Sequence, residues 1–216
     1  SHRVDKYSPD RCDKFKNITV YLTLMSVCSP ICWGDVWRAG AVLFMSDFIL
    51  ARVSQTLAAE QSLETLVRQL LEMLEAVTRM ESTYLTRIDT NAQRQQIMFA
   101  HNSSEMQIPE GFSVPWDESL CKRALEDQCT FSNDVANRWH SCIAAQELGI
   151  ATFLSIPVRL ADGSLFGTLC ATSRQQQPYN LEGEQVMGLF AKLISHYVEK
   201  DTLVQQDRKS TRLNTS

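Results

Sequence analysis

The sequence predicts an α+β fold in which helices cover an antiparallel sheet. Three features indicate this class: a hairpin late in the chain, apolar helical stripes near both of its ends, and short strands and helices between them. Antiparallel strands with helices segregated to the faces of the sheet are typical of such folds. With 216 residues, 44% of them hydrophobic, the chain is long enough to build one sizeable core.

The hairpin spans residues 151–173 and organises the predicted sheet. Asp162-Gly163 separates two apolar, β-branched runs, which is a strong signal for a two-residue type I′ turn. Because side chains alternate between faces along a strand, that turn fixes which side chains share a face. The predicted opposing pairs are Leu160 with Leu165, Val158 with Gly167, Ile156 with Leu169, and Leu154 with Ala171. One face of the hairpin is thus almost wholly apolar, which places it at the centre of the sheet.

Pro157 lies inside the first strand of this hairpin. Proline has no N–H group to donate to a neighbouring strand. We therefore expect either a bulge or an outward, unpaired position at Pro157.

The first part of the fold is predicted as helix followed by two strands. Apolar residues at three- and four-residue steps predict helix over 46–80, and Ser62 is a candidate N-cap inside it. One kinked helix and two separate helices both fit this pattern. Strands are predicted at 82–89 and 95–101. The segment 102–115 contains two prolines and a glycine and has no period, so we expect a loop lying over the sheet.

Short helices around a short strand are predicted next. Asp117 is expected to cap a helix whose apolar face comprises Leu120, Cys121, Ala124 and Leu125. A strand at 129–131 leads into a turn at 132–134. A further helix is expected from about Asn137 to a stop at Gly149, with an apolar face of Trp139, Cys142 and Ile143.

After the hairpin, residues 181–206 are predicted as one long helix. Its apolar residues approximate a coiled-coil stripe of Val186, Leu189, Leu193, Tyr197 and Val204.

The two ends of the sequence differ from its centre. Residues 1–44 follow neither helical nor strand periodicity, and a helical pattern begins only after Met45. Residues 207–216 also lack an apolar period and resemble one reading frame of a sequencing adapter. We therefore expect one domain over 45–206, with a linker helix from about residue 181. The segment 1–44 is expected to be foreign to the native protein or disordered, and the tail 207–216 is expected to be foreign to it.

Composition argues against several classes of function. The net charge of −4 gives no basic face for nucleic acid. Seven cysteines without regular spacing do not form a secreted disulfide framework and favour reduced thiols in the cytoplasm. The uncharged segment 17–34 is poor in Leu and Ile and is interrupted by Pro30, so we do not predict a membrane span there. No phosphate loop, zinc motif or nucleophile elbow occurs, and we expect no cofactor or metal.

Two segments resemble the GAF sensory domain, namely SVPWDESLCKRALEDQCTFSND and LGIATFLSIPVRLADGSLFGTLCATS. The matching features, in order, are Trp116 before Ser119-Leu120-Cys121, Asp134 after the short strand, Leu148-Gly149-Ile150, Pro157, Gly163 and Gly167-Thr168-Leu169-Cys170. The resemblance covers about residues 48–204. More narrowly, the chain from Met45 is similar to the amino-terminal GAF domains of bacterial diguanylate cyclases.

This resemblance implies a six-stranded antiparallel sheet, with the first and last helices on one face and a pocket of loops and short helices on the other. It further implies a homodimer formed through the terminal helices. The implied function is a regulatory module that binds a small molecule or senses redox state and controls a C-terminal diguanylate cyclase in cyclic di-GMP signalling. The Gly-Gly-Asp/Glu-Glu-Phe signature of the cyclase is absent, so this chain itself is not expected to be an enzyme.

The resemblance places six candidate ligand-binding residues around the pocket: Trp116, Ser119, Cys121, Asp134, Trp139 and Cys142. Packing is the alternative for most of them. A buried cysteine behaves as a small hydrophobic residue, and a tryptophan beside a sheet often forms part of the core. An aspartate after a short strand is also a common turn former.

Two other functions remain open. Related GAF proteins reduce free methionine sulfoxide with cysteines at about the positions of Cys121 and Cys142, with Cys129 nearby in sequence. If its imidazolium lay close, His140 would lower the pKa of Cys142, although WHSCIAAQ lacks the acidic residue that follows the cysteine in those enzymes. The other alternative is a dimerisation module whose pocket is filled by its own side chains.

Known GAF ligands are only partly excluded by the sequence. The Cys-His pair that attaches bilins and the Asn-Lys-Phe-Asp-Glu pattern of cyclic-nucleotide binding are both absent. Haem ligation by His101 or His140 stays open.

Overall fold

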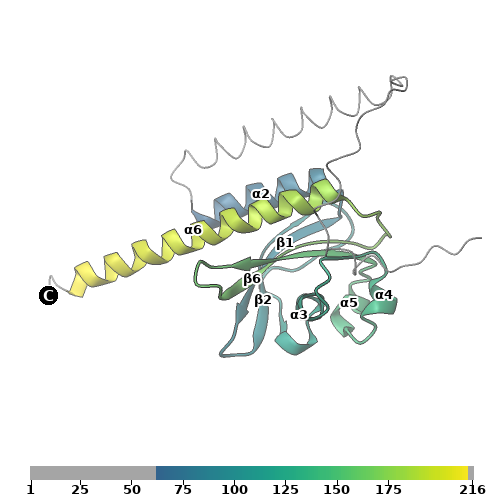
Figure 1. The fold of residues 1–216 in the computed structure, drawn as a ribbon, viewed down its shortest axis with the longest axis horizontal. Helices are drawn as coiled ribbons and strands as arrows, with labels where there is room; N and C mark the ends of the chain where they lie inside the picture. The colour runs from purple at the N-terminus through teal and green to yellow at the C-terminus, as the bar shows by residue number, and fades with distance from the viewer. Residues whose placement is uncertain (1–61, 214–216) are drawn as a thin grey trace, which may run out of the picture. The chain divides into compact units, whose positions relative to one another are not determined.

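The computed structural model describes residues 62–213, with side chains described as far as residue 204. The predictions for residues 1–44 and for helix over 46–61 lie outside this range. Figure 1 shows two long helices side by side over one face of a sheet and short helices beneath the other face. Within the described residues, no helix is long and apolar enough to cross a membrane.

The sheet has six antiparallel strands in the order β3-β2-β1-β6-β5-β4. The strands are β1 (Ser82–Asp89), β2 (Arg94–Asn102), β3 (Ser113–Pro115), β4 (Phe131–Ser132), β5 (Thr152–Arg159) and β6 (Leu165–Ser173). This arrangement confirms the α+β class. Of the two hairpin strands, β6 is central, whereas β5 lies beside the short edge strand β4. The loop predicted over 102–115 is wrong at its end, because Ser113–Pro115 pairs with Arg94–Gln96 of β2. A three-residue strand is too short to show an alternating pattern of its own.

The helices α2 (Leu63–Thr78) and α6 (Leu181–Leu213) cover one face of the sheet (Figure 1). Ser62 caps α2, since its Oγ accepts a hydrogen bond from Thr65 N at 3.2 Å, as its position in the sequence predicted. The apolar residues of α2 that are buried in the core are Leu66, Val67, Leu70, Leu71, Met73, Leu74 and Val77. Burying each such side chain contributes about 1.5–3 kcal/mol, so this helix anchors the domain.

The helix α6 carries two apolar stripes. The stripe that packs into the core comprises Met187, Phe190, Ile194 and Val198. The predicted coiled-coil stripe lies beside it: Leu189 is 44% exposed and Val204 is 38% exposed, whereas Val186, Leu193 and Tyr197 are half-buried. The helix also continues to Leu213, past the predicted end at residue 206.

The β5–β6 hairpin confirms three of the four predicted pairs, Leu154 with Ala171, Ile156 with Leu169 and Val158 with Gly167. The two-residue turn is wrong, because Arg159, and not Leu160, opposes Leu165. Gly163 has φ 82° and its N–H donates to Leu160 O at 2.9 Å, which makes a three-residue loop. This loop places only Gly163 in the left-handed region, whereas a type I′ turn would also force Asp162 there.

Pro157 lies opposite Thr168 of β6, and the side of β5 on which its missing N–H would point is unpaired, as expected. Ser155 N donates to Thr130 O on the β4 side of β5, at 2.8 Å. Backbone N–H groups two residues apart point to the same side of a strand, and β4 pairs only with Phe153 and Leu154. The missing donor of Pro157 therefore faces the open edge beyond β4, and a bulge follows between Val158 and Arg159.

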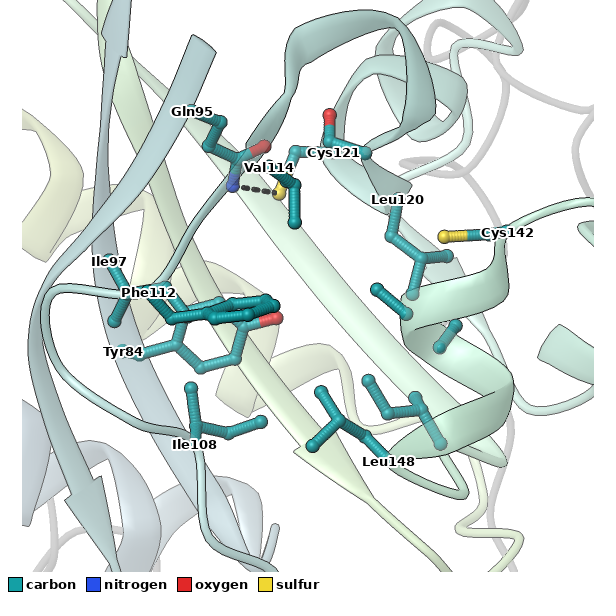
Figure 2. A pocket seen from close by; sticks show the side chains of 14 residues that line it. Tyr84, Gln95, Ile97, Ile108, Phe112, Val114, Leu120, Cys121, Cys142 and Leu148 are labelled. Carbon is teal, nitrogen blue, oxygen red and sulfur yellow. Dashed lines mark hydrogen bonds between the residues drawn. The ribbon is translucent and has the colours of Figure 1, made fainter.

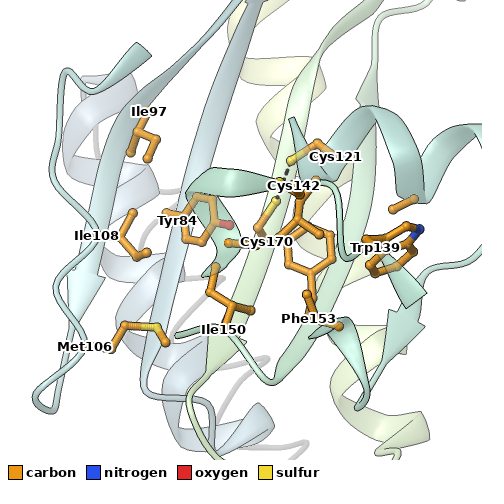
Figure 3. Close-up of a cluster of buried hydrophobic side chains, with 14 of the residues drawn as sticks. Tyr84, Ile97, Met106, Ile108, Cys121, Trp139, Cys142, Ile150, Phe153 and Cys170 are labelled. Carbon is orange, nitrogen blue, oxygen red and sulfur yellow. Dashed lines mark hydrogen bonds between the residues drawn. The ribbon is translucent and has the colours of Figure 1, made fainter. Parts of the chain in front are cut away.

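The two faces of the sheet pack against different sets of helices. Thr83, directly opposite Ala171, donates its hydroxyl to Leu71 O of α2 at 2.8 Å, so the apolar hairpin face lies under the long helices. The opposite face carries Tyr84, Phe153 and Cys170, which belong to a second buried cluster under the short helices (Figure 3).

The short helices differ from their predicted bounds. They are a 3₁₀ turn (Trp116–Glu118), α3 (Leu120–Glu126), α4 (Val135–Arg138) and α5 (Ile143–Glu147). Ser119, and not Asp117, caps α3, because Ser119 Oγ accepts from Lys122 N at 3.1 Å. The carboxylate of Asp117 instead pairs with the Lys122 ammonium.

The single helix predicted from Asn137 is in fact two. Trp139 takes a non-helical conformation between them, with its indole Nε1 donating to Asp127 Oδ2 at 2.8 Å. This break turns Ile143 outward, where it is 66% exposed and not on the predicted apolar face. Gly149 ends α5 with φ 67° at the position after the C-cap, as predicted.

Candidate functional site

A cavity of about 60 Å³ lies between the second face of the sheet and the short helices. Tyr84 and Gln95 contribute to it from β1 and β2, Phe112 and Val114 come from the β2–β3 connection and β3, and Leu148 from the end of α5 (Figure 2). This volume has room for a few water molecules or a molecule of a few heavy atoms. Its walls are mainly aliphatic and aromatic, and none of the described lining residues carries a charge.

Three of the six predicted site residues line this cavity: Ser119, Cys121 and Cys142. The hydroxyl of Ser119 is engaged in local structure, since it donates to Trp116 O at 2.8 Å and accepts from Lys122 N. The two thiols are therefore the predicted groups that remain for chemistry at the cavity.

The other three predicted residues are absent from the cavity wall. Trp139 is buried, contacts Phe153 edge-on at 6.1 Å between ring centroids and donates to Asp127. Trp116 is half-buried against the same cluster. Asp134 is exposed, and both its carboxylate oxygens accept from Asn137 Nδ2 at 2.9 Å. In this structure these side chains support the local fold of the short helices.

Gln95 is a cavity residue that the sequence analysis missed. Its side chain is 5% exposed, and its Nε2 donates to Cys121 Sγ at 3.1 Å (Figure 2). Its Oε1 is buried and has no hydrogen-bond partner among the described residues. An unsatisfied buried acceptor costs about 1–3 kcal/mol. The available signal was strand alternation, which puts Gln95 on the same face as buried Ile97.

Tyr84 is a second missed residue, on the central strand β1 opposite Cys170. Burial, together with the neighbouring cysteines 170 and 121, raises the pKa of its phenol well above the ordinary value. Tyr84 therefore presents a neutral hydroxyl and an aromatic ring to the cavity.

Cys121 contacts a second buried thiol, that of Cys170. Their sulfurs are 3.6 Å apart (Figure 3). Thr168 Oγ1 donates to Cys121 Sγ at 3.1 Å. Hydrogen bonds from Cys170, Thr168 and Gln95 lower the pKa of the Cys121 thiol, although burial opposes them. Burial raises the pKa of Cys170 well above its ordinary value, and Cys121 raises it further.

The predicted arrangement of the other two cysteines is only partly right. Cys142 lies at the cavity, but Cys129 does not line it and donates to Phe131 O at 3.1 Å. Burial raises the pKa of Cys142, and the charge that opposes this is that of Arg123. The predicted activation by His140 is wrong, because His140 is exposed and is not among the groups that shift this pKa.

Neither candidate haem ligand lines the cavity. His101 Nε2 lies 2.9 Å from Glu75 Oε2 of α2, on the other side of the sheet, and His140 is exposed. In the part of the chain that the structure describes, no cluster of three potential metal ligands occurs.

A family model for the GAF domain matches residues 60–199, which is most of the described fold. The chain belongs to the GAF domain family. It is 60% identical over 166 residues to diguanylate cyclase DgcP of Escherichia coli K12. This alignment covers 77% of the chain but 49% of the relative, so the GAF chain spans about half the length of that curated protein.

Solved GAF structures share the fold at low sequence identity. The GAF domain of an Acinetobacter phosphoenolpyruvate-protein phosphotransferase matches with a TM-score of 0.60 and 15% identity, over 74% of this chain and 96% of that one. The phycoerythrobilin-bound GAF domain of a cyanobacterial phytochrome matches with a TM-score of 0.60 and 12% identity, over 75% and 98% of the two chains. At these identities the similarity establishes the fold alone.

Proposed function

We propose that this GAF domain is the sensory module of a diguanylate cyclase, and that a small neutral molecule in its cavity regulates a C-terminal cyclase domain. The identity with DgcP supports the choice of output. The observation that carries the sensory role is the uncharged cavity with the buried, unpartnered oxygen of Gln95 in its wall. The chain carries no cyclase signature, so we do not assign synthesis of cyclic di-GMP to the module itself.

The walls of the cavity restrict the class of ligand. A phosphate or carboxylate placed there would be buried with no cationic side chain in the cavity wall, at a cost of several kcal/mol. A neutral ligand with an apolar body and one N–H or O–H group fits better. Its donor would satisfy Gln95 Oε1, and its body would contact Ile97, Phe112 and Leu148.

The output is proposed to run through α6 in a homodimer. The outer stripe of α6 leaves Leu189 and Val204 exposed on a helix that continues to Leu213. A second copy of the chain would cover this stripe. A ligand that prefers one arrangement of the domain would then shift the packing of α6, and only a difference in affinity between two arrangements can drive such a shift.

Ligand binding can be tested by thermal shift across a panel of small neutral metabolites, with native mass spectrometry of the purified chain. Replacing Gln95 with Leu should abolish the shift given by a hit. Gln96→Leu is the matched control, since Gln96 is the exposed neighbour on the same strand. A panel without hits, together with ligand-free mass spectra, would favour the dimerisation module with a self-filled pocket.

Dimerisation can be tested separately by light scattering. Truncating Val186, Leu189 and Leu193 to alanine should weaken the dimer, while Lys192→Ala, an exposed change on the same helix, should not. An unchanged dimer in the triple variant would refute the role of this stripe.

A further inference from the structure

We propose that Cys121 and Cys170 form a reversible disulfide when a hydroperoxide enters the cavity, which makes the pocket a site of oxidative modification. The regulatory consequence of this bond rests on the proposed sensory function, whereas formation of the bond does not.

The geometry brings the two sulfurs to 3.6 Å, both inside the buried cluster (Figure 3). A disulfide needs a separation of about 2.05 Å, so the sulfurs must approach by about 1.5 Å. Cys170 is held in the middle of the sheet, paired with Tyr84 on β1 and with Ser155 on β5. Cys121 lies on α3, a helix of seven residues, so the approach is made by α3.

The two cysteines differ in their access to an oxidant. Cys121 lines the cavity, whereas Cys170 does not. Cys121 Sγ also accepts hydrogen bonds from Gln95 Nε2 and Thr168 Oγ1, each at 3.1 Å, which stabilise a thiolate. Cys121 is therefore the sulfur that meets the oxidant, and Cys170 is the one that resolves the product.

The chemistry balances with a hydroperoxide as the two-electron oxidant. The Cys121 thiolate attacks one peroxide oxygen, the O–O bond breaks, and hydroxide leaves to take up a proton as water. The Cys170 sulfur then attacks the sulfenic sulfur of Cys121, the S–O bond breaks, and a second water leaves. Two thiols and one hydrogen peroxide become one disulfide and two waters, and a dithiol reductant reverses the change.

The bond would alter the ligand site directly. Drawing Cys121 toward β6 moves one wall of the cavity and removes the acceptor of Gln95 Nε2. We expect the oxidised domain to bind its ligand more weakly than the reduced domain.

The four cysteines of the described domain fall on four different tryptic peptides, which makes the bond easy to map. Cys121 lies on 95–122, Cys129 on 124–138, Cys142 on 139–159 and Cys170 on 160–174. The full chain is treated with hydrogen peroxide, alkylated, digested and analysed by mass spectrometry. We expect peptide 95–122 joined to 160–174, and its loss after treatment with dithiothreitol.

Variants separate this pair from incidental oxidation. In Cys170→Ser, a sulfenic acid should accumulate on Cys121 and be trapped by dimedone, whereas Cys129→Ser should give the same disulfide as the natural sequence. Joining of Cys121 to Cys142 or to an upstream cysteine would overturn the proposal. So would an unmodified Cys121 in both the natural chain and Cys170→Ser. Because the readout needs neither ligand nor cyclase, failure of the sensory proposal leaves it unaffected.

Discussion

Gly167 lies on β6 where the sheet allows no side chain. A Cβ placed there would lie 1.8 Å from Thr86 O and 2.8 Å from Thr86 C, both backbone atoms of the adjacent strand β1. These two strands pair over Ser82–Leu85, and the backbone of Thr86 comes close to Gly167 just beyond that ladder. Gly167→Ala therefore requires the two central strands to move apart.

The loss of stability in Gly167→Ala can be estimated from the backbone contact that the new Cβ would make. Overpacking in a core usually costs about 1–3 kcal/mol, and a collision with backbone in a central strand belongs at or above the upper end. At about 2–4 °C per kcal/mol for a domain of this size, we expect the Tm of Gly167→Ala to fall by about 6–12 °C. The contact of Thr86 Oγ1 with Thr168 Oγ1, now 2.7 Å, should be lost as well.

Gly188→Ala is the matched control. In α6 a Cβ at Gly188 would meet no described heavy atom within 4 Å. Replacing a helical glycine by alanine stabilises by about 0.5–1 kcal/mol, so its Tm should rise by about 1–4 °C. Both variants are measured by calorimetry and urea unfolding. A Tm of Gly167→Ala within 2 °C of the natural chain would refute this account of the β1–β6 contact.

Two further predictions concern residues away from the cavity. Trp139→Phe should lower the free energy of unfolding by about 1–3 kcal/mol, because it removes the hydrogen bond to Asp127 and some buried volume. The affinity of any cavity ligand should stay unchanged, and a loss of affinity would show that Trp139 contacts the ligand. Arg68 holds the pKa of Glu110 below its ordinary value, so this carboxylate stabilises the fold above the unfolded pKa of about 4.5 and loses that contribution as pH falls through the folded pKa. At pH 7 the free energy of unfolding of Glu110→Gln should therefore be lower than that of the natural chain by less than about 1 kcal/mol, because the ion pair is so exposed. This difference should disappear at low pH. A difference that grows as the pH falls would contradict the prediction.

The sequence predicted the structure correctly where neighbouring residues along the chain determine the local conformation. Ser62 caps α2 through an atom three residues away, Gly149 ends α5, and the alternation along β5 and β6 gave three correct pairs. The turn was misjudged because Asp-Gly fits both a two-residue and a three-residue loop. The bulge after Val158 and the hydrogen bond from Gly163 N to Leu160 O show that the three-residue loop forms.

The candidate site was harder to predict because its residues meet only in the folded chain. Gln95 and Cys121 are 26 positions apart, and Cys121 and Cys170 are 49 apart, so no spacing rule joins them. Family resemblance led to Cys121 and Cys142 and overlooked Gln95. Trp139 was proposed for the ligand, but its indole is used to hold the break between α4 and α5.

The cavity and α6 lie on opposite faces of the sheet. The β5–β6 hairpin does not line the cavity, but it contributes residues to the buried cluster beside the cavity and to the face under α6. Cys170 and Phe153 face the short helices, while the alternate residues Leu169 and Leu154 face the long ones. At its far end, the hairpin is tied to α6 near the part of the helix that leaves the domain. Ser195 Oγ donates to Arg159 O at 2.6 Å, and Glu199 Oε1 accepts from Ala161 N.

If the hairpin transmits a change from the cavity, these two bonds are the place to interrupt it. Glu199→Ala removes the acceptor of the Ala161 amide, so hydrogen exchange of that amide should accelerate by about 3- to 10-fold, as expected for a bond of about 1 kcal/mol. The exposed neighbour Lys200→Ala is the control. Ligand affinity should stay unchanged in Glu199→Ala, while the ligand's effect on dimer packing should fall. An undiminished effect on packing would place the connection between the two faces elsewhere, with the contacts of β1 and α2 as the next route to test.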